Sequence, residues 1–82
     1  MKERIFEDYY IVCGPDQSWK LGEQFDSITE AVKGGEEMNR REVERGYKPS
    51  KWIVVRVMFE RLFNDKGEFQ TETTTKIAIS LD

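Results

Sequence analysis

The fold is decided by residues 51–81, which read KWIVVRVMFERLFNDKGEFQTETTTKIAISL. Two long runs of β-branched and aromatic residues flank Asn64-Asp65-Lys66-Gly67. That tetrapeptide is typical of a type I turn followed by a glycine in the left-handed conformation. The stretch therefore predicts a long β-hairpin with a three-residue loop, Asp65 to Gly67.

Both strands of this hairpin carry their more apolar residues at odd positions. Because side chains alternate between the two faces of a strand, an odd-numbered loop lets these two sets share one face. The expected pairs are Phe63 with Phe69, Phe59 with Thr73, Val57 with Thr75, Val55 with Ile77 and Ile53 with Ile79. We expect a helix to cover this layer.

The even positions form a second, mixed face. It carries Trp52, Val54, Met58, Leu62 and Ala78 among Arg56, Glu60, Glu72 and Lys76. In the expected register Glu60 faces Glu72, and Arg56 faces Lys76. Like charges directly opposite each other destabilise a lone sheet slightly. Apolar residues on both faces of the ribbon therefore predict a surface that contacts a partner.

Two shorter strands are expected before the hairpin. Residues from Asp8 to Cys13 are aromatic and β-branched, and residues 14–18 supply turn-forming side chains. Trp19 and Leu21 alternate around Lys20, which predicts a short second strand that pairs back on the first.

One helix is expected between these strands and the hairpin. Ser27 and Glu30 have the spacing of a capping box, and the helix should end near Arg45, before a left-handed Gly46. We expect Gly35, on the apolar stripe, to let the backbone approach the sheet. The neighbouring Gly34 is expected to be unfavourable or to mark a bend.

The whole chain, residues 1–82, is expected to be a single α+β domain. Its 38% hydrophobic content, set against 35% charged residues, is typical of a globular protein. The predicted order β-β-α-β-β gives an antiparallel sheet of about four strands with one long helix packed on one face.

The amino-acid composition also narrows the range of functions that we expect. The sequence has no histidine and one cysteine, Cys13, which removes the commonest general base, the commonest metal ligand and any intrachain disulfide. We expect no enzymatic activity, no cofactor and no metal site. The net charge of -3 makes a general role in binding duplex nucleic acid unfavourable. The chain shows neither an apolar run long enough to span a membrane nor a signal peptide. A cytoplasmic location is expected.

The turn end of the hairpin should project beyond its cover. A helix of roughly 19 residues is about 28 Å long, whereas a strand of about 13 residues reaches about 43 Å. Aromatic residues in such a projecting segment are enriched at interfaces. The residues predicted to contact a protein partner, through the open sheet face and the hairpin tip, are Trp52, Met58, Leu62, Phe63 and Phe69.

The order of three segments resembles that of compact proteins encoded by bacteriophages and mobile elements. These segments are Tyr9-Tyr-Ile-Val, Phe25-Asp-Ser-Ile-Thr-Glu-Ala-Val and Trp52-Ile-Val-Val-Arg-Val. Some proteins of this class inhibit CRISPR or related host defence complexes. The resemblance implies a non-enzymatic, anti-CRISPR-like inhibitor that acts in the host cytoplasm by binding a larger protein.

Two other functions are compatible with the sequence. A basic cluster with interleaved Tyr47 and Trp52 could hold single-stranded nucleic acid by stacking and phosphate contact. Its cations are Arg40, Arg41, Arg45, Lys48 and Lys51. The second alternative is a homodimeric adaptor joined by edge strands or sheet faces.

Overall fold

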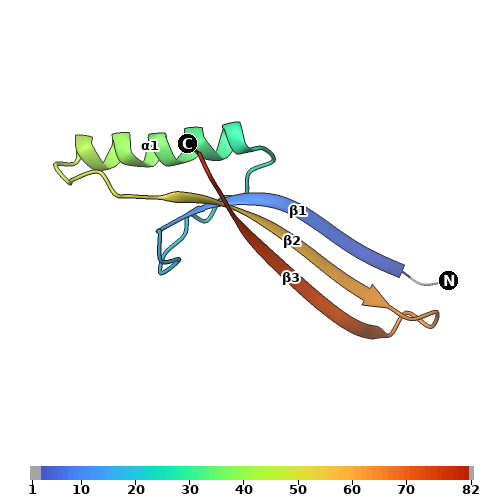
Figure 1. Cartoon of the computed structure of the whole chain (residues 1–82). Helices are drawn as coiled ribbons and strands as arrows, with labels where there is room; N and C mark the ends of the chain where they lie inside the picture. The colour runs from blue at the N-terminus through green and yellow to red at the C-terminus, as the bar shows by residue number, and fades with distance from the viewer. Residues whose placement is uncertain (1–2, 82) are drawn as a thin grey trace.

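The computed structural model describes residues 3–81 and is of the α+β class, as predicted. Its elements are, in chain order, β1 (Glu3–Cys13), α1 (Ile28–Glu44), β2 (Ile53–Phe63) and β3 (Phe69–Ile79). The strands form one antiparallel sheet in the order β1-β2-β3, with β2 in the centre (Figure 1).

The sheet has three strands, so the expectation of about four was wrong. The segment predicted as a second strand makes only an isolated bridge, between Lys20 and Cys13. A second bridge, between Phe25 and Tyr10, follows a few residues later. The connection between β1 and α1 therefore touches the edge of β1 at two points without running along it, because a turn and Gly22 interrupt the extended conformation.

The turn of the β2–β3 hairpin has the predicted conformation. Gly67 has a φ of 79° and its N–H donates to the Asn64 carbonyl at 3.0 Å. The Asn64 side-chain oxygen accepts from the backbone N–H groups of Lys66 and Glu68, both at 2.9 Å. Phe63 pairs with Phe69, as expected. Turn chemistry alone was sufficient to place the loop.

The register beyond that first pair differs from the prediction. Leu62 pairs with Thr71, so Gln70 is an extra residue that forms a β-bulge in β3. The observed pairs are Phe59 with Thr74, Val57 with Lys76, Val55 with Ala78, Val54 with Ile79, Glu60 with Thr73 and Arg56 with Ile77. The four expected pairs beyond Phe63–Phe69 and the two expected like-charge pairs were therefore wrong. Past the bulge, even residues of β3 share a face with odd residues of β2.

α1 packs on the face formed by even residues of β1 and β2, which we call the helix face. This corrects the expectation that the helix covers the layer of Ile53, Val55, Val57 and Phe59. Val12, Ala31 and Val54 are fully buried there. Tyr10, Leu21, Phe25, Val32, Trp52 and Ile79 pack around them. The bulge brings Ile79 to this face, where it joins the apolar cluster.

The ends of α1 agree with the sequence prediction. The Ser27 side chain accepts from the Glu30 N–H at 3.1 Å, which caps the first turn. The helix ends at the Arg45 cap, and Gly46 follows with a φ of 89°. Gly35 is buried against Trp52, as its place on the stripe predicted. Gly34 packs against Phe25, which gives this position a packing role that the sequence did not predict.

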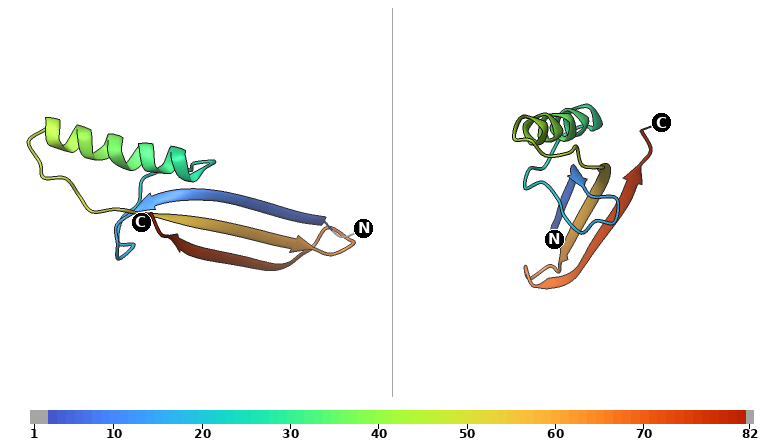
Figure 2. Two further views of the ribbon diagram at one scale, coloured as in Figure 1. Left: turned by 45° about the horizontal axis from the view of Figure 1, so that its top comes forward. Right: turned by 90° about the vertical axis from the view of Figure 1, so that its left-hand side faces the viewer.

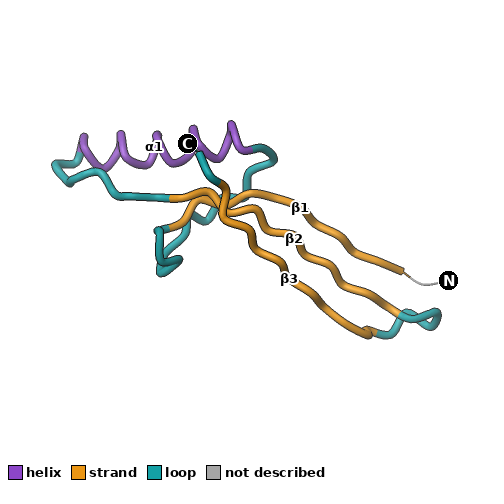
Figure 3. Tube along the Cα trace, viewed as in Figure 1, coloured by secondary structure: helices purple, strands orange, loops and turns teal. Residues whose placement is uncertain are grey.

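A second buried cluster lies on the other side of the sheet, which we call the opposite face. Ile11, Cys13, Val55 and Val57 are buried there, with Tyr9 and Ile53 packed against them. Residues 20–24 line a hollow of about 170 Å³ together with this face. Figure 3 shows part of the β1–α1 connection on the side of the sheet away from α1. Both faces are thus covered at one end, which forms the body of the molecule.

The rest of the sheet projects from the body as an arm, which comprises residues 3–8, 58–63 and 69–75 with the hairpin loop. Figure 2 shows the three strands extending past α1. The molecule measures 55 × 25 × 21 Å, and its radius of gyration is 16.3 Å, against about 12 Å for a compact chain of this length. The predicted projection of the hairpin tip is confirmed.

Candidate protein-binding arm

The opposite face of the arm carries an aromatic cluster built around one arginine. We define the aromatic cluster as Phe59, Arg61, Phe63 and Phe69. The Arg61 guanidinium carbon lies 5.4 Å from the centre of the Phe59 ring and 5.8 Å from that of Phe69. The Phe63 and Phe69 rings meet edge to face at 6.3 Å. Arginine stacks favourably on aromatic faces. The Arg61 side chain stays 41% exposed, although its Nε is buried without a hydrogen-bond partner.

A cross-strand ion pair further fixes this arginine. One terminal nitrogen of Arg61 lies 3.0 Å from Glu72 Oε2 on β3. On the other side, Ile5 of β1 is the register partner of Arg61 and is 45% exposed. Phe69 is 58% exposed. The aromatic cluster, on β2 and β3, therefore continues onto β1 through Ile5, and Phe69 and Ile5 are its exposed parts.

The helix face of the arm is more polar. Arg4 Nε lies 2.6 Å from Glu60 Oε2, and Arg56 Nε donates to Asp8 Oδ1 at 2.9 Å. The hydrogen bond from Arg56 lowers the pKa of the Asp8 carboxyl below its ordinary value. Between these ion pairs Phe6 is 49% exposed, with the Arg4 guanidinium 5.1 Å from its ring centre. The charges on this face are largely paired across strands.

The five residues predicted to bind a protein do not form one surface. Phe63 and Phe69 lie in the aromatic cluster, whereas Met58 and Leu62 lie on the helix face of the arm, half-buried. Trp52 packs with the apolar cluster beneath α1, in contact with the backbone of Gly35. The arm thus carries four of the five predicted residues, two on each of its faces.

Sequence reasoning missed the contribution of β1 to the arm. The strand begins at Glu3, whereas the sequence led us to expect it from Asp8. Ile5 and Phe6 are consequently absent from the predicted site, although both are exposed on the arm. Their β-prone character was the available signal, but the flanking charges obscured it. Charged residues of this kind are common on edge strands.

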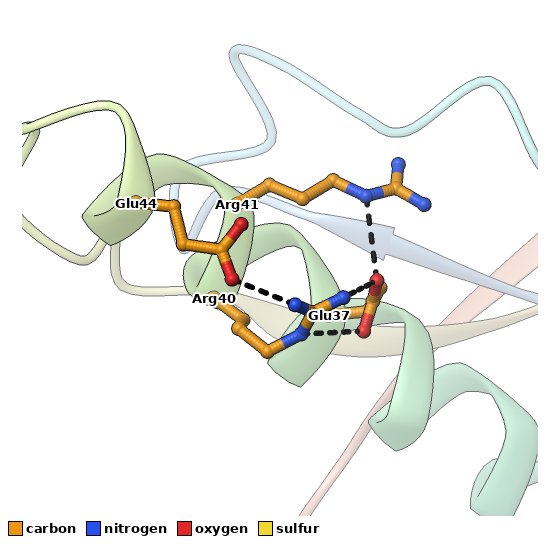
Figure 4. A network of polar contacts seen from close by, with 4 residues as sticks. All are labelled: Glu37, Arg40, Arg41 and Glu44. Atoms are coloured by element: carbon orange, nitrogen blue, oxygen red, sulfur yellow. Dashed lines mark hydrogen bonds and ion pairs between the residues drawn. The ribbon is translucent and has the colours of Figure 1, made fainter.

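Arg40 and Arg41 of α1 are paired with glutamates of the same helix. Arg40 donates to Glu37 at 3.0 Å and to Glu44 at 2.8 Å, and Arg41 Nε lies 3.4 Å from Glu37 (Figure 4). The hydrogen bonds from Arg40 lower the pKa of the Glu37 carboxyl. Figure 4 shows the network along one side of α1.

The rest of the predicted basic cluster is dispersed. Arg45, Lys48 and Lys51 are exposed at the end of α1 and in the connection to β2, as is Tyr47. The Trp52 ring packs under α1, so it is not presented for stacking on bases. The structure does not combine these cations and both aromatic rings into one surface.

Among the described residues, the other cavities and side-chain groups do not form a recognisable catalytic or metal-binding arrangement. An open groove of about 610 Å³ runs between α1 and residues 21–25, and its walls carry both acidic and basic residues. Within residues 3–81, histidine, cysteine and carboxylate side chains nowhere gather in a group of three that could hold a metal ion. Cys13 is buried, and burial raises the pKa of its thiol. In the same range no helix has the length and apolar character needed to cross a membrane.

Comparison with models of protein families, with curated proteins and with solved structures found no match to this chain.

Proposed function

We propose that this chain is a non-enzymatic protein-binding protein that engages another protein through its arm. The observation that supports the proposal most strongly is the aromatic cluster, a group of three phenylalanines and an arginine that extends from the hollow of the body, at Phe59, along the uncovered part of the sheet. Aromatic residues and arginine are the side chains most enriched at the centres of protein interfaces.

The free energy gained by burying exposed apolar side chains favours a protein as the partner. Burying a large apolar side chain fully contributes about 1.5–3 kcal/mol, and the exposed Phe69, Ile5 and Phe6 do not use that contribution in folding. The strands hold these side chains on a hydrogen-bonded scaffold, so less conformational entropy is lost when they are covered than for an unstructured segment. A protein surface with apolar pockets matches such an arm.

A narrower form of the proposal is an inhibitor encoded by a bacteriophage or mobile element, acting in the host cytoplasm on a defence complex. Its support is the resemblance in segment order, together with the small size and mild acidity of the chain. An arm that protrudes from a small body can occupy a surface on a larger complex, which is sufficient for inhibition without catalysis. The lack of histidine and the burial of Cys13 fit this mode of action.

Site-specific photo-crosslinking in the producing cell tests the proposal. A photoreactive phenylalanine analogue is placed at Phe63, a member of the aromatic cluster near the hairpin loop, or at Tyr47, an aromatic residue outside the arm that is 63% exposed. We expect one discrete heteromeric adduct from position 63 and none from position 47. Excess wild-type protein should abolish the adduct, whereas excess Phe63→Ala should compete at least about tenfold less well.

Equal adducts from both positions, or none from position 63, would contradict the proposal. The narrower form is tested with purified CRISPR effector complexes. Addition of the wild-type chain should reduce target cleavage, and Phe63→Ala should not. Cleavage that is insensitive to the wild-type chain would remove the inhibitory role but not protein binding.

A further inference from the structure

β3 presents a long, exposed edge. It has 11 residues, and all but Ile79 are exposed. β2 pairs with one side of it, and no described residue pairs with the other. The edge of β1 differs, because Phe25 bridges it at Tyr10 and its outer half is rich in charged residues. The bulge at Gln70 and the charges of Glu72 and Lys76 are features that protect an edge strand from non-specific pairing. A strand that pairs with this edge must therefore complement both charges.

The sequence of β3 is self-complementary about Thr74. If two copies of the strand run antiparallel with their Thr74 residues opposite each other, each Glu72 faces a Lys76 of the second copy. Between these two opposite-charge pairs lie only threonines, and cross-strand threonine pairs are favourable. Towards the ends Thr71 faces Ile77, and the regular ladder stops at the Gln70 bulge.

Other registers lose this complementarity. A shift of one residue is excluded, because N–H and C=O groups point outward only at alternate residues of an edge strand. The next allowed registers place Glu72 opposite Thr74 or Ala78, and Lys76 opposite Gln70 or Thr74. Among these three registers, only the pairing centred on Thr74 sets Lys76 of one copy opposite Glu72 of the other. Glu72, which already pairs with Arg61 of its own chain, would then lie between two cations.

We infer that two copies of this chain pair through β3 and form a continuous six-stranded antiparallel sheet, in which Glu72 of each copy pairs with Lys76 of the other. The two-fold axis passes through Thr74 and runs perpendicular to the sheet, so both helices lie on one face at opposite ends. The β3 edge of each copy pairs with the β3 edge of the second copy, so neither is left exposed. The assembly therefore closes at two chains. The pairing uses the edge of the sheet and does not depend on the proposed function of the arm.

Charge reversal tests the pairing. Lys76→Glu sets two carboxylates opposite each other at both ends of the ladder, and Glu72→Lys sets two ammonium groups opposite each other at the same places. We expect sedimentation equilibrium to give a mass of twice 9.7 kDa for the wild type and a dissociation constant raised at least about tenfold for each variant. An equimolar mixture of the two variants restores opposite charges at both ends, so it should form a heterodimer of near wild-type affinity.

The heterodimer is the decisive result, since general destabilisation of either variant cannot produce it. Lys48→Glu makes the same charge change far from β3 and should leave the dimer intact. Thr74→Lys, a second variant at an exposed position, sets two lysines against each other on the axis and should also dissociate the dimer. Circular dichroism should show native secondary structure in every variant.

Three results would overturn the inference. These are a single-chain mass for the wild type at high concentration, dimers that persist in both charge variants, and masses that grow without limit, as pairing of β3 with β1 of the next copy would give. Phe63→Ala should keep the dimer mass, and Lys76→Glu should keep the crosslink from position 63. Failure of one proposal is therefore distinguishable from failure of the other.

Discussion

Two glycines in the middle of α1 show how single residues set the packing of the body. A Cβ atom at Gly35 would lie 2.5 Å from Cε2 of Trp52, and one at Gly34 would lie 2.5 Å from Cζ of Phe25. Each glycine costs the helix about 1 kcal/mol relative to alanine. Close packing of the helix backbone against two aromatic rings offsets that cost.

Gly35→Ala is expected to destabilise the fold although alanine is the better helix former. The added methyl group must displace the Trp52 ring, and overpacking of this kind costs about 1–3 kcal/mol. Urea denaturation followed by tryptophan fluorescence measures the change. Gly22→Ala is the matched control, because a Cβ there meets nothing within 4 Å. Equal free energies of unfolding for the two variants would contradict this account.

The ion pair between Asp8 and Arg56 predicts a pH dependence of stability. Because Arg56 lowers the pKa of Asp8 in the folded chain, the unfolded chain takes up its proton first as the pH falls. The contribution is present above the ordinary value of 3.8 and is lost as the pH falls through the lower, folded-state pKa. Asp8→Asn should flatten the decline in the free energy of unfolding below about pH 4. An unchanged slope would show that the pair contributes nothing.

The reactivity of the Cys13 thiol measures how readily the body opens. The side chain is 1% exposed, and burial raises the pKa of the thiol, so little reactive thiolate is available in the native state. Reaction with a chromogenic disulfide reagent should be at least about a hundredfold slower in buffer than in denaturing urea. Rapid labelling under native conditions would contradict the packing of this cluster.

At the scale of elements, the sequence predicted the ends of structures better than their register. The hairpin turn and the limits of α1 follow from local chemistry at Asn64, Gly67, Ser27 and Gly46. The bulge at Gln70 has no comparable signal. Threonines occupy both faces of β3, so the pattern reads almost equally well in either register. Packing of the half-buried Ile79 against the body favours the observed register.

The same bulge limited the prediction of the site. Phe63 and Phe69 were placed correctly next to each other, because the turn fixes their pairing. The role of Trp52 was assigned on the assumption that its face lay open, whereas α1 covers that face at the body. The aromatic cluster also needs Arg61, whose partner Glu72 is identified only when the bulge is known.

Deleting Gln70 should test the role of the bulge. Without the extra residue, Thr71 follows Phe69 directly, and β3 keeps its observed pairs, from Leu62 with Thr71 to Val54 with Ile79, in a regular ladder. The Ile79 contacts are retained, so we expect the deletion to change the free energy of unfolding by less than about 0.5 kcal/mol. Ile79→Ala removes those contacts and should lower it by about 1–3 kcal/mol. A deletion as costly as Ile79→Ala would show that the bulge itself stabilises the sheet.

At the scale of the whole molecule, the body and the arm differ in what stabilises them. The body holds the two buried clusters on either side of the sheet. The arm depends on strand hydrogen bonds, cross-strand ion pairs and the aromatic cluster, with most of its side chains at least partly exposed. Elements with few buried apolar contacts open at lower free energy than the core.

Amide hydrogen exchange should therefore be slow at the body end of the sheet and fast at the arm end. Amides of Val12, Val54 and Val55 are expected to exchange only through global unfolding, because their side chains are fully buried. Amides of residues 3–8 should exchange at least about a hundredfold faster through local fraying at the free edge of β1. Nuclear magnetic resonance resolves the two groups in one experiment. Uniform protection along β1 would contradict the division into body and arm.

The elongated outline affects how this protein moves through a solvent. A particle of 55 × 25 × 21 Å experiences more frictional drag than a sphere of equal mass. A single chain of 9.7 kDa will therefore have an enlarged Stokes radius and leave a gel-filtration column early, at a position normally read as a heavier species. Early elution by itself is thus the expected behaviour of one chain, and the same drag will slow its rotational tumbling.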